Sequence, residues 1–308
     1  MLWLIFAIIG YISFAIIFIL DKIIVSKKLS RPVVYTFYST IFMFVALFAL
    51  PSLGFPLLVG VDWLWALVSG VSFGFGLWTL FIALKNNETT HISPFNGAFV
   101  TVFVYFFSNL FLGEQITGLK QVAVIILICS ALLLSFEKTR KSVKGFHVGF
   151  HVGFLWAILS GLFFAISHVS AKYLYGIYPF WTAFIWSRAS TGLVGLFTLF
   201  FPAVYLSFKK KHKQTDKINK NKHVAVFIII DKLLSVVGVV SIQYAIAIGS
   251  VTVVNALIGV QYIFMFLFVF LLTKFYPKVF REYFVKKELF IEVVAILLVV
   301  VSTALFVF

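Results

Sequence analysis

Charge is scarce in this chain. Only 11% of its 308 residues are Asp, Glu, Lys or Arg, whereas 62% are hydrophobic and the mean hydropathy is +1.11. Soluble globular domains carry about 25% charged residues. The composition therefore excludes an ordinary soluble domain and indicates a membrane protein.

Cysteine and cofactor-binding motifs are equally sparse. Cys129 is the single cysteine and lies inside an apolar run, so an intrachain disulfide and a thiolate zinc site are excluded. The sequence has no Gly-rich phosphate loop and no His-Glu-x-x-His, so we expect no cofactor and no direct use of ATP. His147 and His151 would share one face of a helix, but no cysteine or acidic partner follows them. We expect a local duplication there and no metal site.

Basic residues exceed acidic ones, 25 to 10. In a soluble protein this excess would suggest a nucleic-acid partner, but here Lys and Arg lie in short segments between apolar runs and are typical of topology signals. All of them fall on one side of the predicted membrane except Lys120, Lys172, Arg188 and Lys232. Because cytoplasmic loops are rich in Lys and Arg, we expect both termini outside the cytoplasm, in a plasma (inner) membrane protein that contacts lipid and no nucleic acid. The Lys-rich loop 208–223 sets topology in this interpretation, and contact with anionic lipid is the alternative.

Long apolar runs dominate the chain. A bilayer core of about 30 Å is crossed by roughly 20 residues of helix. We predict an all-α membrane protein with ten transmembrane helices, near Leu2 to Leu20, Val33 to Leu50, Trp63 to Leu84, Ile92 to Leu112, Ile116 to Phe136, Val152 to Leu174, Pro179 to Leu206, Val224 to Ile248, Val251 to Leu272 and Phe290 to Phe308.

The chain also repeats itself weakly. Three sets of residues recur at offsets that rise in order, from 150 through 162 to 172: Phe14, Ala15, Ile16 and Lys22 as Phe164, Ala165, Ile166 and Lys172; Ala83, Thr90 and Gly97 as Ala245, Thr252 and Gly259; Val122, Ala123, Ser130 and Phe136 as Val294, Ala295, Ser302 and Phe308. Five helices per half is an odd number, so the second half is inverted. We predict a first five-helix repeat in residues 1–136, a cytoplasmic linker in 137–151 and a second repeat in 152–308.

Short motifs accompany this organisation. Lys22 and Lys172 close the first helix of each half, the stretch Leu110-Phe111-Leu112-Gly113-Glu114 is followed by Gly118, and Pro179 precedes Arg188 by nine positions. Together these resemble the drug/metabolite transporter superfamily, in its EamA-like branch of ten-helix carriers. The chain departs from the family pattern at Ile41 and Tyr276, and relatives are usually described with cytoplasmic termini. The resemblance implies a permease that moves small metabolites by alternating access.

Four ionisable residues lie deep in predicted helices, where they usually face a protein interior or a wet cavity: Arg188, His168, Asp231 and Lys232. Arg188 and Asp231 fall at similar depths, close enough to pair if their helices face each other. One hypothesis has Arg188 and His168 bind an anionic or zwitterionic group, with Asp231 and Lys232 as counter-ion or coupling residues. The alternative is a fixed ion-pair network of Arg188, Asp231 and Lys232.

Other polar and aromatic residues extend the candidate substrate site: Asn96, Asn255, Gln261, Tyr244 and Trp186. Taken singly, such amides more often bridge helices, and such rings more often face lipid. Trp186 is included because it lies two positions from Arg188.

Three functions follow. A secondary transporter of an amino acid or a similar polar or amphipathic solute, acting as a monomer or homodimer, is preferred. A flippase-like carrier of a lipid-linked or amphipathic substrate is the alternative. A membrane-embedded enzyme is disfavoured, because Asp231 is the only deep acid that the predicted helix boundaries give and no paired buried carboxylates are expected.

Overall fold

Helices make up most of the described part of the chain. The computed structural model describes residues 1–27, 31–86, 89–115, 118–135, 152–211 and 222–275, together with 290–291, 293–295, 297–298, 301–302 and 305 near the C-terminal end. Every regular element within these ranges is a helix, which confirms the predicted all-α fold class. The predicted linker 137–151, with His147 and His151, and most of the Lys-rich loop lie outside the described residues.

The elements follow the apolar runs closely. In chain order they are α1 Leu2–Lys27, α2 Pro32–Ile41, the 3-10 helices η1 Phe42–Ala49 and η2 Pro51–Leu53, α3 Asp62–Asn86, α4 Thr89–Leu112, α5 Leu119–Ser135, α6 Val152–Tyr175, α7 Phe180–Thr198, α8 Pro202–Lys211, α9 Lys222–Ile248, α10 Val251–Ala256 and α11 Ile258–Phe275.

Seven segments of the described chain are long and apolar enough to cross a bilayer, or eight if α7 and α8 form one broken span. The prediction of one continuous helix from Pro179 to Leu206 is wrong, because α7 and α8 meet at an angle of 88°. Pro202 explains the break, since proline disfavours helical backbone in the residue before it and donates no backbone hydrogen bond. The predicted helix from Val251 has a turn at Leu257, between α10 and α11, but the two helices form one span from Val251 to Phe275. The ten-helix count stays a prediction.

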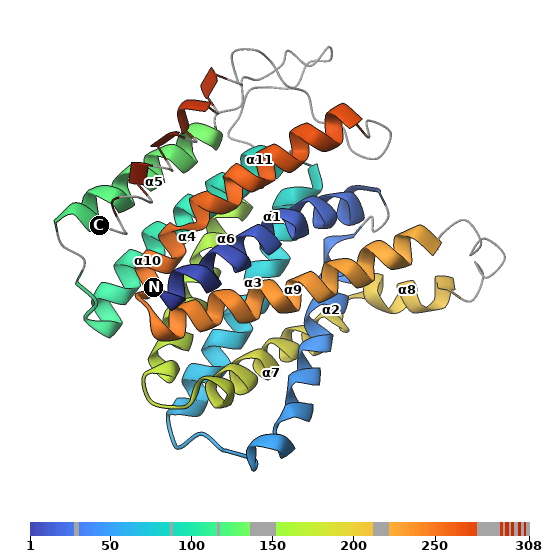
Figure 1. Cartoon of the computed structure of the whole chain (residues 1–308). Helices are drawn as coiled ribbons and strands as arrows, with labels where there is room; N and C mark the ends of the chain where they lie inside the picture. The colour runs from blue at the N-terminus through green and yellow to red at the C-terminus, as the bar shows by residue number, and fades with distance from the viewer. Residues whose placement is uncertain are drawn as a thin grey trace.

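Helices from the two halves of the sequence pack against each other. α1 lies between α9 and α11, while α6 contacts both α3 and α4 (Figure 1). Small residues allow the closest approaches, as is usual between membrane helices. At Gly70 on α3, an added Cβ would lie 2.2 Å from the backbone oxygen of Ser187 on α7. This packing holds Arg188, the next residue, in the interior of the helix bundle.

Candidate functional site

Arg188 is the most deeply buried cation in the described part of the chain. It lies in the middle of α7, its side chain is 1% exposed, and its Nε, Nη1 and Nη2 atoms have no hydrogen-bond partner among the described residues. The guanidinium carbon lies 4.2 Å from the ring centre of Phe73 and 5.9 Å from that of Phe184. Aromatic faces attract a cation, but they satisfy none of its five N–H donors. The site therefore presents an unused set of donors, suited to a carboxylate or phosphate.

His168 and Asn255 form a hydrogen-bonded pair near this cation. His168 Nδ1 lies 2.7 Å from Asn255 Oδ1, and Asn255 Nδ2 donates to the Val251 backbone oxygen. Because the amide nitrogen is used there, Asn255 Oδ1 is the acceptor and His168 Nδ1 carries the proton, which leaves Nε2 as an acceptor. Arg188 is close enough to His168 to interact with it electrostatically. Three predicted site residues are thus brought into one region.

Tyr175 belongs to the same region, although the sequence analysis did not single it out. Its hydroxyl donates to Gln243 Oε1 at 2.8 Å, and it also lies within electrostatic reach of Arg188. The bond joins α6 to α9. Nothing in the local sequence distinguishes Tyr175 from the other tyrosines near helix ends.

Asn96 and Gln261 bridge helices. Asn96 Nδ2 donates to the Ala157 backbone oxygen at 2.8 Å, which links α4 to α6. Gln261 Nε2 donates to Ser93 Oγ at 3.3 Å, which links α11 to α4. Both amides have less than 4% of their surface exposed. In this conformation each holds helices together by the kind of bond that is common between membrane helices.

Trp186 and Tyr244 make aromatic contacts. The Trp186 indole N–H donates to the Pro56 backbone oxygen at 2.9 Å, and its ring packs edge-on against Trp63. Residues two apart on a helix do not face each other, so the Trp186 indole is directed to the segment before α3 rather than to the guanidinium of Arg188. Tyr244 packs edge-on against Phe6 and Phe180.

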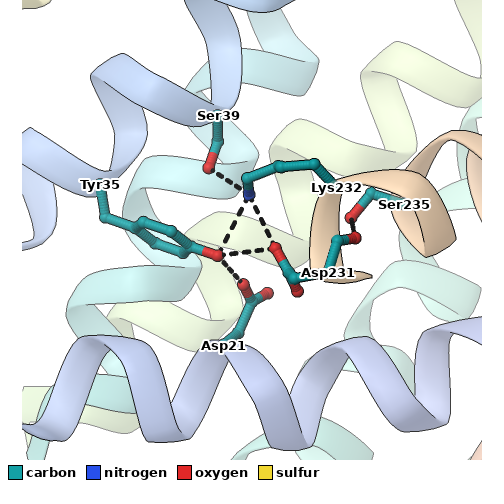
Figure 2. A network of polar contacts seen from close by, with 6 residues as sticks. All are labelled: Asp21, Tyr35, Ser39, Asp231, Lys232 and Ser235. Atoms are coloured by element: carbon teal, nitrogen blue, oxygen red, sulfur yellow. Dashed lines mark hydrogen bonds and ion pairs between the residues drawn. The ribbon is translucent and has the colours of Figure 1, made fainter. Parts of the chain in front are cut away.

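Asp231 and Lys232 belong to a second polar cluster, which we name the Asp21–Asp231 cluster: Asp21 on α1, Tyr35 and Ser39 on α2, and Asp231 and Lys232 on α9 (Figure 2). The Tyr35 hydroxyl oxygen lies 2.5 Å from Asp21 Oδ1 and 2.9 Å from Asp231 Oδ2. Lys232 Nζ lies 2.9 Å from Asp231 Oδ2 and donates to the hydroxyls of Tyr35 and Ser39. Asp21, Tyr35 and Asp231 are buried, whereas 31% of the Lys232 side chain is exposed.

This cluster corrects two expectations. The proposed ion-pair network of Arg188 with Asp231 and Lys232 is wrong, because Asp231 pairs with Lys232 while the Arg188 nitrogens make no hydrogen bond to either residue. The expectation that Asp231 is the only deep acid is also wrong, because Asp21 is buried beside it. Asp21 was missed because the predicted first helix ended at Leu20, whereas α1 continues to Lys27.

One sequence signal could have found Asp21. The hexapeptide Ile19-Leu-Asp-Lys-Ile-Ile24 resembles Ile229-Ile-Asp-Lys-Leu-Leu234, an Asp-Lys pair between apolar residues in both cases. A carboxylate inside an apolar helical stretch is costly unless it is paired, so two such stretches predict two carboxylates that face protein. The packing of α1 against α9 then brings the two acids to one tyrosine.

Glu114 and Lys172, the motif residues at the opposite end of the bundle, connect helix termini. Glu114 Oε2 accepts from Thr252 N and Oγ1, at 3.3 and 2.9 Å, at the start of α10. Lys172 Nζ donates to the backbone oxygens of Ile246, Ala247 and Gly249, at the end of α9. A carboxylate at a helix N-terminus and a cation at a C-terminus both stabilise the helix. The Glu114–Thr252 contact also joins the two halves of the chain, whereas the Lys172 contacts lie within the second half.

Comparison with known proteins identifies the family of the first half. Residues 1–136 match the family model of the EamA-like transporter family, which confirms the resemblance to the drug/metabolite transporter superfamily. The family implies an integral membrane transporter of small solutes. Among curated proteins none matches. One solved crystal structure superposes with a TM-score of 0.59 at 15% identity over 97% of each chain, a likeness of fold alone.

Proposed function

We propose that this chain, an EamA-like transporter over residues 1–136, is a secondary carrier that moves a small anionic or zwitterionic solute, such as an amino acid, across the plasma membrane by alternating access. Arg188 carries this proposal, because its guanidinium is fully buried and its donors have no acceptor. An unpaired charge in a protein interior is costly, and a protein keeps one where a ligand pairs with it. A carboxylate that enters the site supplies that acceptor.

The position of Arg188 supports a carrier. Phe73 of α3 and Phe184 of α7 flank its guanidinium, and His168 of α6 is close enough to interact with it electrostatically. The proposed inverted repeats meet in this region, and substrate sites of such carriers lie near the midplane at the repeat interface. His168 Nε2 offers an acceptor for an ammonium group of the same solute. We therefore propose a zwitterionic substrate in preference to a purely anionic one.

Binding of solutes to purified protein tests the proposal. A metabolite panel is screened by thermal shift in detergent, because a ligand that binds the folded state raises its apparent stability. We expect carboxylate-bearing solutes to stabilise the native protein and to lose their effect in Arg188→Met. Lys274→Met, which removes an exposed cation at the end of α11, is the matched control. Retained binding with unchanged affinity in Arg188→Met rejects the proposal.

The aromatic surroundings of Arg188 favour one alternative. Phe73 and Phe184 flank the guanidinium, and Phe164 packs against Phe73 at 5.4 Å between ring centres. Such a ring-lined anion site also suits an amphipathic substrate with an acidic head, as in a flippase-like carrier. Liposomes that contain the protein distinguish the two, since a flippase transfers labelled lipid between leaflets and a solute carrier accumulates the soluble ligand.

A further inference from the structure

In the Asp21–Asp231 cluster, two carboxyl groups contact the hydroxyl of Tyr35, which has one proton to donate. The Tyr35 hydroxyl oxygen contacts Asp21 Oδ1, Asp231 Oδ2 and Lys232 Nζ. A phenol donates one hydrogen bond and accepts the others. Lys232 donates to it, so one carboxylate accepts the phenol proton and the other carboxyl group must itself donate. The geometry therefore requires one additional proton on a carboxyl oxygen.

Charge balance leads to the same count. With both acids ionised and Lys232 protonated, the cluster has a net charge of −1 among side chains that are 6% exposed for Asp21 and 0% for Asp231. One bound proton makes the cluster neutral, and burial strongly favours a neutral set. α3 faces Tyr35 with the ring of Phe81, and α1, α2 and α9 supply no other described titratable group to the hydroxyl.

The contacts indicate which acid holds the proton. Asp231 Oδ2 accepts from Lys232 Nζ at 2.9 Å and is the ionised partner of that cation. Asp21 Oδ1 is then the protonated oxygen, which donates to Tyr35, while Tyr35 donates to Asp231 Oδ2. Asp231 Oδ1 is buried with no hydrogen-bond partner among the described residues.

We propose that Asp21, Tyr35 and Asp231 form a binding site for one proton, and that proton binding is coupled to movement of α1 against α9. Loss of the proton leaves two carboxylates that face each other across one hydroxyl, and like charges at this range repel. The repulsion separates α1 from α9, and uptake of a proton restores the arrangement seen here. The coupling to transport rests on the proposed carrier function, whereas the proton site does not.

Infrared difference spectroscopy of the full chain in phosphatidylcholine vesicles tests the site without any solute. We expect a carbonyl-stretch band of a protonated carboxyl group that disappears as the pH is raised and is absent in Asp21→Asn. Asp62→Asn is the matched control, because Asp62 accepts a hydrogen bond from a tyrosine, Tyr178, with no second acid in that contact. A band of full amplitude in Asp21→Asn overturns the proposal.

Tyr35→Phe is the second variant if Asp21→Asn fails to fold, as judged by gel filtration and circular dichroism. It keeps both acids and removes the bridging hydroxyl, so the frequency of the band and the pH at which it disappears both change. An unchanged band in Tyr35→Phe overturns the site. If only the proposed carrier function is wrong, the carboxyl band is still observed. If only the proton site is wrong, Arg188-dependent solute binding is still observed.

Spin labels test the coupling. Cys129 is replaced by Ser, and labels are placed on exposed positions of the two helices, at Ile9→Cys on α1 and Leu233→Cys on α9. We expect the distance distribution between the labels to change with pH and to become independent of pH in Asp21→Asn. A distribution that stays the same across the pH range in which the carboxyl band disappears refutes the coupling.

Discussion

Ser130 and Ser302 each donate a hydrogen bond to a backbone oxygen of the segment that carries the other serine. Ser130 Oγ on α5 donates to the Ala295 backbone oxygen at 2.7 Å, and Ser302 Oγ donates to the Ala123 backbone oxygen at 2.5 Å. Both pairs, Ser130 with Ser302 and Ala123 with Ala295, are separated by the offset of 172 residues found in the sequence. A two-fold axis between the two segments produces such an exchange. The contact supports the proposal of two related halves.

Removal of either serine hydroxyl is expected to lower the free energy of unfolding by the same amount. Ser130→Ala and Ser302→Ala each delete one interhelical hydrogen bond, worth about 0.6 kcal/mol on average between membrane helices. Unfolding measured in mixed micelles checks the two values and their sum. Ser13→Ala is the control, because its hydroxyl bonds only to Ile9 of its own helix in the described contacts. A cost confined to one of the two serines contradicts the two-fold relationship.

Arg188→Met is expected to stabilise the protein in the absence of solute. The change removes a buried cation without an acceptor, and replacement of buried charges by apolar residues of similar volume is often neutral or stabilising, by about 1–4 kcal/mol. Thermal unfolding without added ligand measures the effect, and Arg31→Met at an exposed position is the control. A large loss of stability would show that Arg188 has a structural role.

Glu114→Ala is expected to destabilise the start of α10. The carboxylate accepts two hydrogen bonds from Thr252, and loss of a helix cap costs about 1 kcal/mol. Hydrogen exchange at α10 and thermal unfolding of the whole protein check this result. The neighbouring Gln115→Ala, at an exposed position, should change neither. Equal effects of the two substitutions would refute a capping role.

The orientation in the membrane is testable with single cysteines in a Cys129→Ser background. Val59 and Lys85 are exposed; Val59 lies just before the start of α3 and Lys85 lies in its last turn. From the distribution of Lys and Arg, we expect a membrane-impermeant maleimide to label Val59→Cys in intact cells. Lys85→Cys should react only after the cells are permeabilised. The reverse labelling pattern would place the basic segments outside the cytoplasm and both termini inside it.

The sequence alone determined the class of the protein. Long apolar runs with few charges specify helices in lipid, because unpaired backbone groups are too costly there, and each of the seven spans found overlaps one predicted segment. The rising offsets between the repeated residues and the motif around Gly113-Glu114 indicated a family, and the family-model match over residues 1–136 confirmed this resemblance. Arg188 and His168 were recognised because ionisable residues inside such runs are rare.

Only the tertiary structure decided which polar groups meet. Depth along a helix, which the sequence gives, placed Arg188 and Asp231 at similar levels, yet the direction in which each side chain points depends on how the helices pack. Asp231 faces Tyr35 and Lys232, and Arg188 faces Phe73. Packing of α1 against α9 brings Asp21 and Asp231 together although some 210 residues of sequence separate them. No local pattern specifies this contact, because side chains distant in the chain meet only through the packing of whole helices.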